Sequence, residues 1–247
     1  MHAPIAGWAH PFGAQACAHP NSMVVCAIMD VMCALAYGER LAAAEASGLL
    51  VLHHGRGSDE LDLLALADVL DPQRALHVVA PRAPLSLEGL GGYHWYVVPR
   101  VGHPDPETFA AGYGQLAAFH DELWERTGIG PERTVLGGFS MGAAMSYALG
   151  LGGDRPVPAG ILAFSGFIPS VPGWEPDLAA RAGLGVLIAH GRADPVIPVA
   201  FAQRARELLT VGGLRVEYHE TGGVHEIEAR NAEAATEWLR RTFAQGS

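Results

Sequence analysis

The chain has 247 residues, of which 49% are hydrophobic and 17% charged, and its formal net charge is −10. A chain of this size and composition can bury one large core as a single domain. Its negative charge argues against nucleic acids and anionic membrane surfaces as partners. No window has the roughly 20 unbroken apolar residues of a membrane-spanning helix.

Residues 1–38 differ in character from the rest and contain all three cysteines. An odd number of cysteines argues against a disulfide framework and favours free thiols in a reducing compartment, so we expect a cytoplasmic protein. Residues 23–37 resemble the apolar core of a signal peptide, but Asp30 interrupts them and no Lys or Arg precedes them. Two interpretations remain: a loosely packed extension over 1–38, or a protein that begins near Met32. We expect one folded domain over 39–247.

Apolar strand candidates alternate with helical segments along this domain. Strands are expected at 48–53, 75–80, 133–137, 159–165, 184–190 and 214–220, and helices at 106–127, 143–149, 197–211 and the C-terminus. This alternation predicts an α/β fold with a mostly parallel central sheet and helices on both faces.

The first of these strands runs into His54-Gly55-Arg56-Gly57. A His-Gly loop in this place is typical of loops that supply a backbone N–H to an oxyanion, and the small residues let the backbone approach a substrate carbonyl. We assign that donor to the N–H of Arg56. The pair His53-His54 also suggests a metal site, but adjacent strand residues point to opposite faces, so we expect no metal there.

Residues 82–108 are rich in proline and glycine, which predicts a long loop at the edge of the sheet where a site would lie. Its central aromatic segment is Tyr93-His94-Trp95-Tyr96. We expect Tyr93 and Trp95 to form a hydrophobic wall for the substrate, although such rings can instead anchor the loop to the core. Phe167 and Ile168, after the expected strand at 159–165, are further candidates for that wall.

The pentapeptide Gly138-Phe139-Ser140-Met141-Gly142 lies between an expected strand and an expected helix. This context is the one in which Gly-x-Ser-x-Gly mounts a nucleophilic serine on a tight strand-to-helix turn. The helix start also directs free backbone N–H groups and the positive end of the helix dipole at a developing oxyanion. Ser140 is therefore the predicted nucleophile, and the N–H of Met141 is the predicted second oxyanion donor.

Two later strand ends supply an acid and a base. Asp194 follows the strand at 184–190, and His225 follows the strand at 214–220. The order Ser, acid, His matches a catalytic triad in which His225 takes the serine proton and Asp194 orients the imidazole. Each has competing candidates and a structural alternative, because Asp194 before a proline suits a turn and His225 suits a helix start. The competing acids are Asp154 and Asp177, and the competing bases are His190 and His219.

Five co-linear motifs together resemble the phospholipase/carboxylesterase family of α/β-hydrolases. These motifs are His54–Glu60, Pro81–Pro84, Gly138–Gly142, His190–Pro198 and Gly223–Ile227. The similarity runs from about Leu49 to Phe243. It implies a cofactor-free serine hydrolase that acts on esters or thioesters.

We therefore expect a carboxylesterase for small or medium acyl esters that works through an acyl-enzyme. The first alternative is an acyl-protein thioesterase or lysophospholipase-like enzyme for longer acyl chains. The second is a hydrolase fold used only for binding, which would be expected to lack a complete triad. Aromatic residues exposed near the site would also be compatible with a homodimer.

Overall fold

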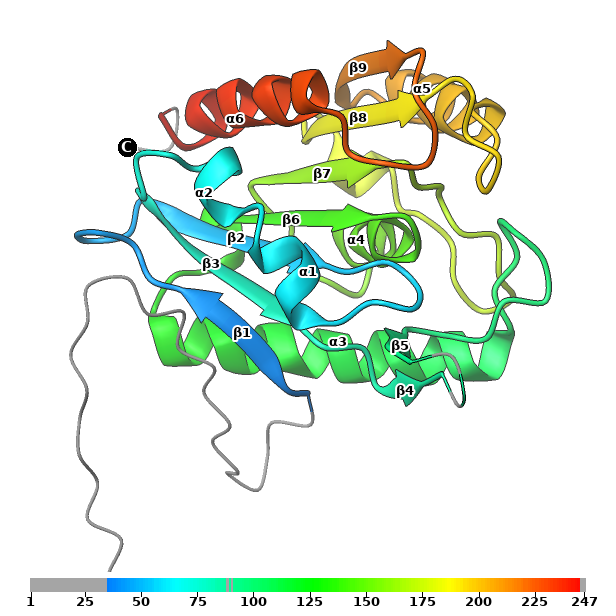
Figure 1. The fold of residues 1–247 in the computed structure, drawn as a ribbon, viewed down its shortest axis with the longest axis horizontal. Coiled ribbons are helices and arrows are strands. Elements are labelled where there is room, and N and C mark those ends of the chain that lie inside the picture. Colours follow the sequence, from blue (N-terminus) through cyan, green and yellow to red (C-terminus); the bar gives the residue numbers. More distant parts are fainter. Residues whose placement is uncertain (1–34, 88, 90, 245–247) are drawn as a thin grey trace, which may run out of the picture.

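The computed structural model describes residues 35–87, 89 and 91–244, and the described part contains a seven-stranded sheet (Figure 1). The spatial order is β1-β3-β2-β6-β7-β8-β9, with β1 antiparallel to β3 and every other pair parallel. The strands are β1 (Tyr37–Arg40), β2 (Gly48–His53), β3 (Leu76–Pro81), β6 (Thr134–Phe139), β7 (Gly160–Phe164), β8 (Gly185–Gly191) and β9 (Arg215–Thr221). The predicted α/β architecture is confirmed.

Helices cover both faces of this sheet. On one face lie α1 (Glu60–Leu64), α2 (Ala67–Leu70) and α6 (Ala229–Ala244), and on the other α3 (Pro106–Thr127), α4 (Met141–Leu151) and α5 (Ala200–Val211) (Figure 1). The remaining elements are a hairpin of β4 (Leu85–Ser86) and β5 (Tyr93–His94) and the short 3₁₀ turns Pro131–Arg133 and Ala179–Arg181.

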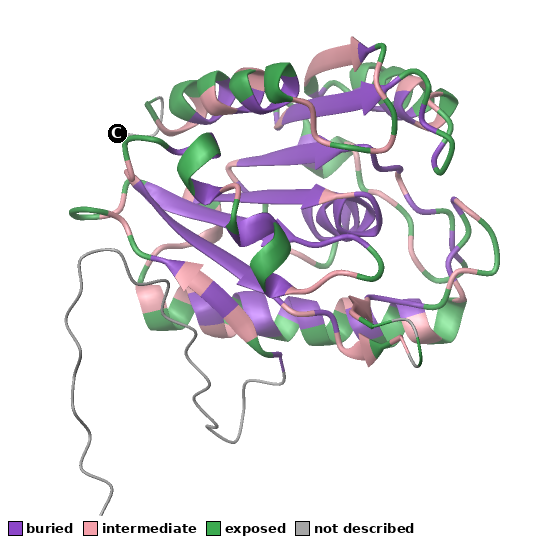
Figure 2. Cartoon of the chain, in the orientation of Figure 1, coloured by how far each residue is buried: buried purple, intermediate pink, exposed green. Residues whose placement is uncertain are grey.

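The central strands are buried on both sides, which explains their nearly continuous apolar sequences (Figure 2). In β2, Leu49 and Val51 pack toward α3 and α4, whereas Leu50 and Leu52 pack toward α1, α2 and α6. Every residue of α4 is buried, so this helix passes through the middle of the molecule.

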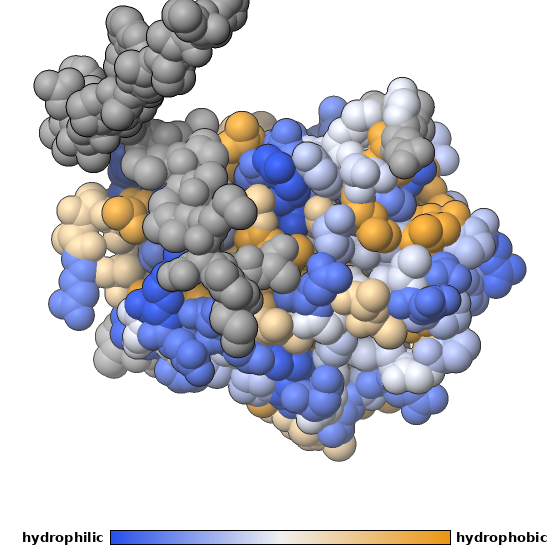
Figure 3. All heavy atoms as spheres, turned by 90° about the horizontal axis from the view of Figure 1, so that it is seen from below, coloured by the Kyte–Doolittle hydropathy of each residue, from blue (hydrophilic) through white to orange (hydrophobic). Residues whose placement is uncertain are grey.

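The predicted helix at 106–127 coincides with α3. Asp105 caps it by accepting a hydrogen bond of 2.9 Å from the N–H of Thr108, Pro106 begins it, and Gly128 ends it with φ at 66°. The surface on the α3 side is mostly hydrophilic, with scattered hydrophobic side chains (Figure 3).

Five short strands and helices were not predicted: β1, α1, α2, β4 and β5, of which the last two form a hairpin. Each has at most five residues, too few for a hydrophobic period to emerge. The predicted extension over 1–38 lies outside the described residues except for its last four. Of those, Tyr37 and Gly38 already belong to β1.

Candidate active site

Ser140 lies between the end of β6 and the first residue of α4. Its φ of 56° and ψ of −119° fall in a region that side-chain-bearing residues rarely adopt, and such strain is held where the surrounding structure fixes it. Serine at the start of a helix usually caps it, but the Ser140 hydroxyl makes no capping hydrogen bond. The turn leaves the hydroxyl available to another side chain.

The glycines around Ser140 are needed because backbones meet there. A Cβ at position 138 would lie 2.5 Å from the carbonyl carbon of Gly142, and a Cβ at position 142 would overlap the carbonyl of His53 at the end of β2. The first turn of α4 therefore rests directly against the last residue of β2. The two ends of the pentapeptide are fixed by this contact.

The structure brings Ser140, His225 and Asp194 into one hydrogen-bonded chain. Ser140 Oγ lies 2.9 Å from His225 Nε2, and His225 Nδ1 lies 2.6 Å from Asp194 Oδ2. If Nδ1–H donates to the carboxylate, Nε2 keeps the lone pair that can accept the serine proton. The Asp194 side chain is fully buried, whereas 16% of the His225 side chain is exposed. Solvent therefore reaches the imidazole but not the carboxylate.

Backbone groups fix Asp194 from below. Its Oδ1 accepts hydrogen bonds of 2.8 Å from the N–H groups of both Val196 and Ile197. His190, the sixth residue of β8, lies beneath the same carboxylate, with Nε2 at 2.8 Å from the Ile197 carbonyl oxygen and 3.3 Å from Asp194 Oδ2. Burial lowers the pKa of His190, which favours its neutral form at neutral pH.

The loops that carry Asp194 and His225 are joined through their backbones. The N–H of Arg192 donates to the Thr221 carbonyl and the N–H of Ala193 donates to the Gly223 carbonyl, both at 2.9 Å. Gly191 permits this approach, because a Cβ there would overlap the carbonyl oxygens of residues 223 and 224. The acid and the base therefore share one rigid platform at the carboxyl ends of β8 and β9.

The competing candidates lie elsewhere or act differently. Asp154 accepts a hydrogen bond from the Tyr113 hydroxyl, and Asp177 accepts one from the N–H of Ala180. His219 lies within β9, where it contacts Glu217. His190 touches the acid and not Ser140. The described structure joins none of these four to the Ser140 hydroxyl.

The two N–H groups predicted as oxyanion donors, those of Met141 and Arg56, belong to segments that lie beside Ser140. Met141 is the first residue of α4, and Arg56 follows Gly55, where a Cβ would lie 3.5 Å from the Ser140 Cβ. Within the part of the chain that the structure describes, neither N–H has a hydrogen-bond acceptor. Both N–H groups are therefore free to donate to a ligand, and their role as oxyanion donors stays a prediction.

Two neighbouring side chains hold the Arg56 loop in place. His54 Nδ1–H donates to the Gly55 carbonyl at 2.7 Å, and its Nε2 accepts from the N–H of Ala83 at 3.0 Å. Burial lowers the pKa of His54, in keeping with the neutral ring that this pattern requires. Trp95 Nε1–H donates to the His54 carbonyl at 2.9 Å. His54 and Trp95 thus support the loop, a role that the sequence did not reveal.

The aromatic segment divides between core and surface. Trp95 has no exposed surface and Tyr96 only 1%. The expectation that Trp95 forms a wall against the substrate is therefore corrected: its ring supports the Arg56 loop from beneath. Tyr93 is half-buried, with the Arg82 guanidinium over its ring at 4.7 Å from the centroid. Of the two predicted wall residues, Tyr93 and Trp95, Tyr93 is the one whose side chain is partly exposed.

Phe167 and Ile168 follow β7, and Ile168 borders a groove of about 700 Å³ between the 168–176 loop and α5. Phe167 is buried and packs with Ala144 of α4 and Ile197, which follows the catalytic-acid candidate. Ile168 is half-buried and lines the groove with Trp174 and Phe201. Phe167 therefore packs against α4, and the next residue, Ile168, is the first of this segment to line the groove.

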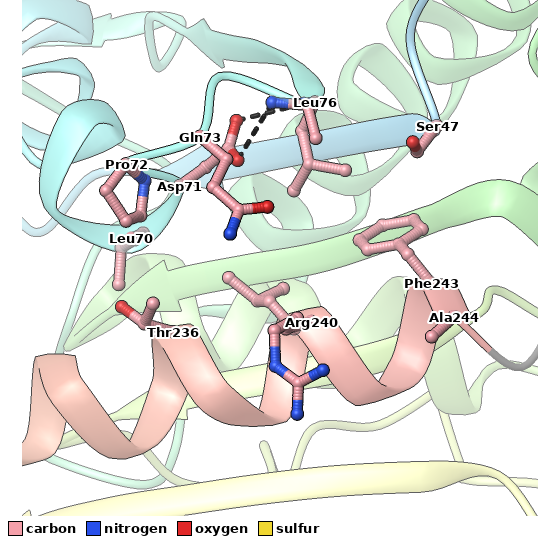
Figure 4. Close-up of a pocket in the computed structure, with 12 residues that line it drawn as sticks. Ser47, Leu70, Asp71, Pro72, Gln73, Leu76, Thr236, Arg240, Phe243 and Ala244 are labelled. Carbon is pink, nitrogen blue, oxygen red and sulfur yellow. Dashed lines mark hydrogen bonds between the residues drawn. The ribbon is translucent and has the colours of Figure 1, made fainter.

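A second cavity, of about 240 Å³, lies at the opposite edge of the sheet (Figure 4). Its lining includes Ser47 and Leu76 at the amino ends of β2 and β3, and Leu239 and Arg240 of α6. A six-residue strand separates the two edges by roughly 20 Å, so this cavity does not belong to the Ser140 site.

Among the described residues, no group of three or more His, Cys, Asp or Glu side chains is arranged to hold a metal ion. No helix in the same part of the chain combines the length and hydrophobicity needed to cross a membrane.

Known proteins resemble this chain in sequence over most of its length. The phospholipase/carboxylesterase family matches residues 41–243. Acyl-protein thioesterase 1 of Debaryomyces hansenii is 28% identical over 199 residues, covering 74% of this chain and 85% of the relative. The putative hydrolase MhqD of Bacillus subtilis is 27% identical over 196 residues, covering 79% and 94%.

Solved structures are similar over a comparable part of the chain. A carboxylesterase from Mesorhizobium loti superposes with a TM-score of 0.74 at 25% identity, covering 85% of this chain and 96% of that one. Esterase PE8 superposes with a TM-score of 0.70 at 31% identity, covering 84% and 99%.

Proposed function

The chain belongs to the phospholipase/carboxylesterase family of hydrolases, and we propose that it is a serine carboxylesterase for small to medium acyl esters. The observation that carries the proposal is the continuous hydrogen-bonded chain from Ser140 through His225 to Asp194. A serine at positive φ that leaves its own helix uncapped has its hydroxyl directed to the imidazole instead.

In the proposed acylation step, Ser140 Oγ attacks the ester carbonyl carbon while His225 Nε2 takes the hydroxyl proton. The negative charge moves onto the carbonyl oxygen, which the N–H groups of Arg56 and Met141 face. His225 then gives its proton to the alkoxide leaving group as the C–O bond breaks. Asp194 stabilises the imidazolium that exists between these two transfers.

Deacylation repeats the sequence with water as the nucleophile. His225 takes a proton from the water that attacks the acyl-enzyme, and it returns a proton to Ser140 Oγ when the acid leaves. The partial exposure of His225 supports this step, since water reaches the imidazole from the solvent side.

The second candidate function is hydrolysis of thioesters or esters of longer acyl chains. The groove beside Ile168 favours it, because an extended chain needs apolar surface beyond the reacting carbonyl. The same triad would serve a thioester, so the two candidates differ in the groove and not in the chemistry. A role in binding alone would leave the Ser140–His225–Asp194 arrangement unexplained.

Hydrolysis of p-nitrophenyl esters from acetate to palmitate, run beside an acyl-thioester series of the same lengths, tests the proposal. We expect the highest kcat/KM on oxygen esters between acetate and octanoate. A maximum on palmitoyl substrates would select the second candidate. Absence of activity on every ester and thioester would reject both.

The substitution Ile168→Trp is expected to narrow the groove where it begins. We predict that kcat/KM for octanoate esters falls by about tenfold relative to acetate esters, since several methylenes lose their apolar contact. The measurement is the octanoate-to-acetate ratio in the variant and the wild type. Val157→Trp, on an exposed residue just before β7, should leave that ratio unchanged. An unchanged ratio in Ile168→Trp would separate the groove from acyl binding.

A further inference from the structure

A buried row of polar side chains lies beneath the proposed oxyanion site. His53, the last residue of β2, has its Nδ1 at 2.8 Å from Ser146 Oγ of α4 and its Nε2 at 3.1 Å from His120 Nε2 of α3. Ser146 Oγ lies 3.1 Å from the Gly142 carbonyl oxygen. His53 and Ser146 have no exposed surface and His120 only 1%.

The protons in this row have one consistent arrangement. A carbonyl oxygen only accepts, so the Ser146 hydroxyl donates to Gly142 and its oxygen must accept from His53 Nδ1–H. His53 Nε2 then carries a lone pair, and His120 Nε2–H donates to it. Both rings are neutral, in keeping with burial, which lowers the pKa of each below its usual value.

This row spans the two backbone segments that carry the proposed oxyanion donors. His53 begins the run that continues through His54 and Gly55 to Arg56. Gly142, which the Ser146 hydroxyl bonds, directly follows Met141. The same two segments are in direct contact, because position 142 has no room for a Cβ against the His53 carbonyl. A shift of His53 or Ser146 would therefore move the two donors relative to one another.

Trp95 makes a parallel connection between the same segments. Its ring packs edge-on against His53 with centroids 5.8 Å apart, and its indole N–H donates to the His54 carbonyl. Its backbone N–H donates to Met141 Sδ at 3.2 Å. The end of β2 and the start of α4 are thus joined by polar contacts on two sides.

Packing alone does not account for these residues. The two histidine rings pack against the aromatic rings of Trp95, Phe119 and Trp124, a setting in which an apolar side chain would bury no polar atom. His120 Nδ1 is buried and has no partner among the described residues, and a lone pair left in this state destabilises the fold. An apolar side chain would avoid the cost of this unpaired nitrogen, but it would not fix the distance between the end of β2 and the start of α4 through hydrogen bonds.

We propose that His53, held by His120 and bonded to Ser146, is a positioning residue for the oxyanion site. It keeps the Arg56 and Met141 N–H groups directed at one point while the carbonyl oxygen becomes negative. The inference rests on the proposed ester hydrolysis and adds a residue whose side chain never touches the substrate.

The test compares two buried hydroxyls that have the same pattern of hydrogen bonds. Ser146 accepts from a ring N–H and donates to a backbone carbonyl. Thr134, at the other end of β6, accepts from Trp124 Nε1–H at 2.9 Å and donates to the Gly130 carbonyl at 2.8 Å. Ser146→Ala and the matched control Thr134→Val therefore remove equivalent interactions, one beside the oxyanion donors and one roughly 20 Å away.

Two further variants address the histidine itself. His53→Leu removes both of its hydrogen bonds, and His53→Asn places an amide N–H near the position of Nδ1, from which it can donate to Ser146. Each protein is assayed below its melting temperature for kcat and KM on a short p-nitrophenyl ester. The inhibition constant of a trifluoromethyl ketone, whose hemiketal oxyanion occupies the same site, is measured in parallel.

We expect Ser146→Ala and His53→Leu to lower kcat by roughly 10- to 100-fold with KM within about twofold, and to weaken the ketone by a similar factor. His53→Asn should recover most of the loss, and Thr134→Val should lose thermal stability but keep kcat and the inhibition constant. Ser146→Ala removes a single oxygen, so it remains testable where His53→Leu fails to fold. If Ser146→Ala matches Thr134→Val in kcat and inhibition, the inference is wrong. A wild-type enzyme inactive on all esters would instead reject the proposed function.

Discussion

Replacing Ser140 with alanine is expected to lower kcat on ester substrates by about 10⁴-fold or more, because the attacking oxygen is removed. The free energy of unfolding should change by less than about 1 kcal/mol, since among the described residues the Ser140 hydroxyl bonds only to His225 and caps no helix. Steady-state hydrolysis of a p-nitrophenyl ester measures the first quantity, and urea denaturation measures the second. Intact-mass analysis after treatment with a fluorophosphonate should show one adduct on the wild type and none on the variant.

Ser165 offers a close control for this experiment. It directly follows β7, the strand beside β6, and it is buried with φ at 48°, close to the φ of 56° at Ser140. Among the described residues, its hydroxyl has no hydrogen-bond partner, and so no histidine bonds it as His225 bonds Ser140. Ser165→Ala should therefore retain activity and fluorophosphonate labelling. Full activity in Ser140→Ala, or its loss in Ser165→Ala, would place the nucleophile elsewhere.

The convergence of Ser140, Asp194 and His225 was predictable because it depends on sheet topology alone. Each follows a different strand, and parallel strands that share a sheet bring their carboxyl ends to one edge. The hydrophobic runs before each residue identify those strands without knowledge of any contact. The fold class followed from the same runs, since strands buried on both faces have nearly continuous apolar sequences.

The supporting residues were not predictable because their contacts join distant parts of the chain. His53 meets His120 across 67 positions and Ser146 across 93. Nothing in the local sequence distinguishes His120 from the other polar residues of α3, and a helical period gives only the face on which it lies. Trp95 illustrates the same limit: an aromatic residue in a loop has two plausible environments, and only the fold selected the buried one.

Acid should destabilise the protein well above the pH at which carboxylates are protonated. Burial lowers the pKa of His120 to about 3 and that of His53 well below its usual value of 6.5. Between these values the unfolded chain binds more protons than the folded one, so stability rises with pH and is lost as pH falls below 6.5. From pH 6.5 to 5 we expect a loss of between about 1 and 2 kcal/mol for each histidine, or about 3 kcal/mol together.

Neighbouring charged groups also affect the pKa values on which this pH dependence rests. Arg155 further lowers the pKa of His120, whereas Asp121 opposes the shift. Carboxylates act at lower pH: hydrogen bonds from Gln203, Arg192 and Tyr218 lower the pKa of Glu220 to about 2, so its contribution fades only below about pH 4.5. The interval from pH 5 to 6.5 therefore isolates the histidines.

Urea denaturation at several pH values in this interval measures the slope of unfolding free energy against pH. His120→Phe removes one buried titrating ring of similar size, so the slope should fall by about 1 kcal/mol per pH unit even if the variant is less stable overall. His103→Gln, which removes an exposed histidine, should leave the slope unchanged. A slope that His120→Phe does not alter would mean that this ring exchanges protons in the folded state as readily as in the unfolded chain, which is incompatible with its burial against His53 of β2.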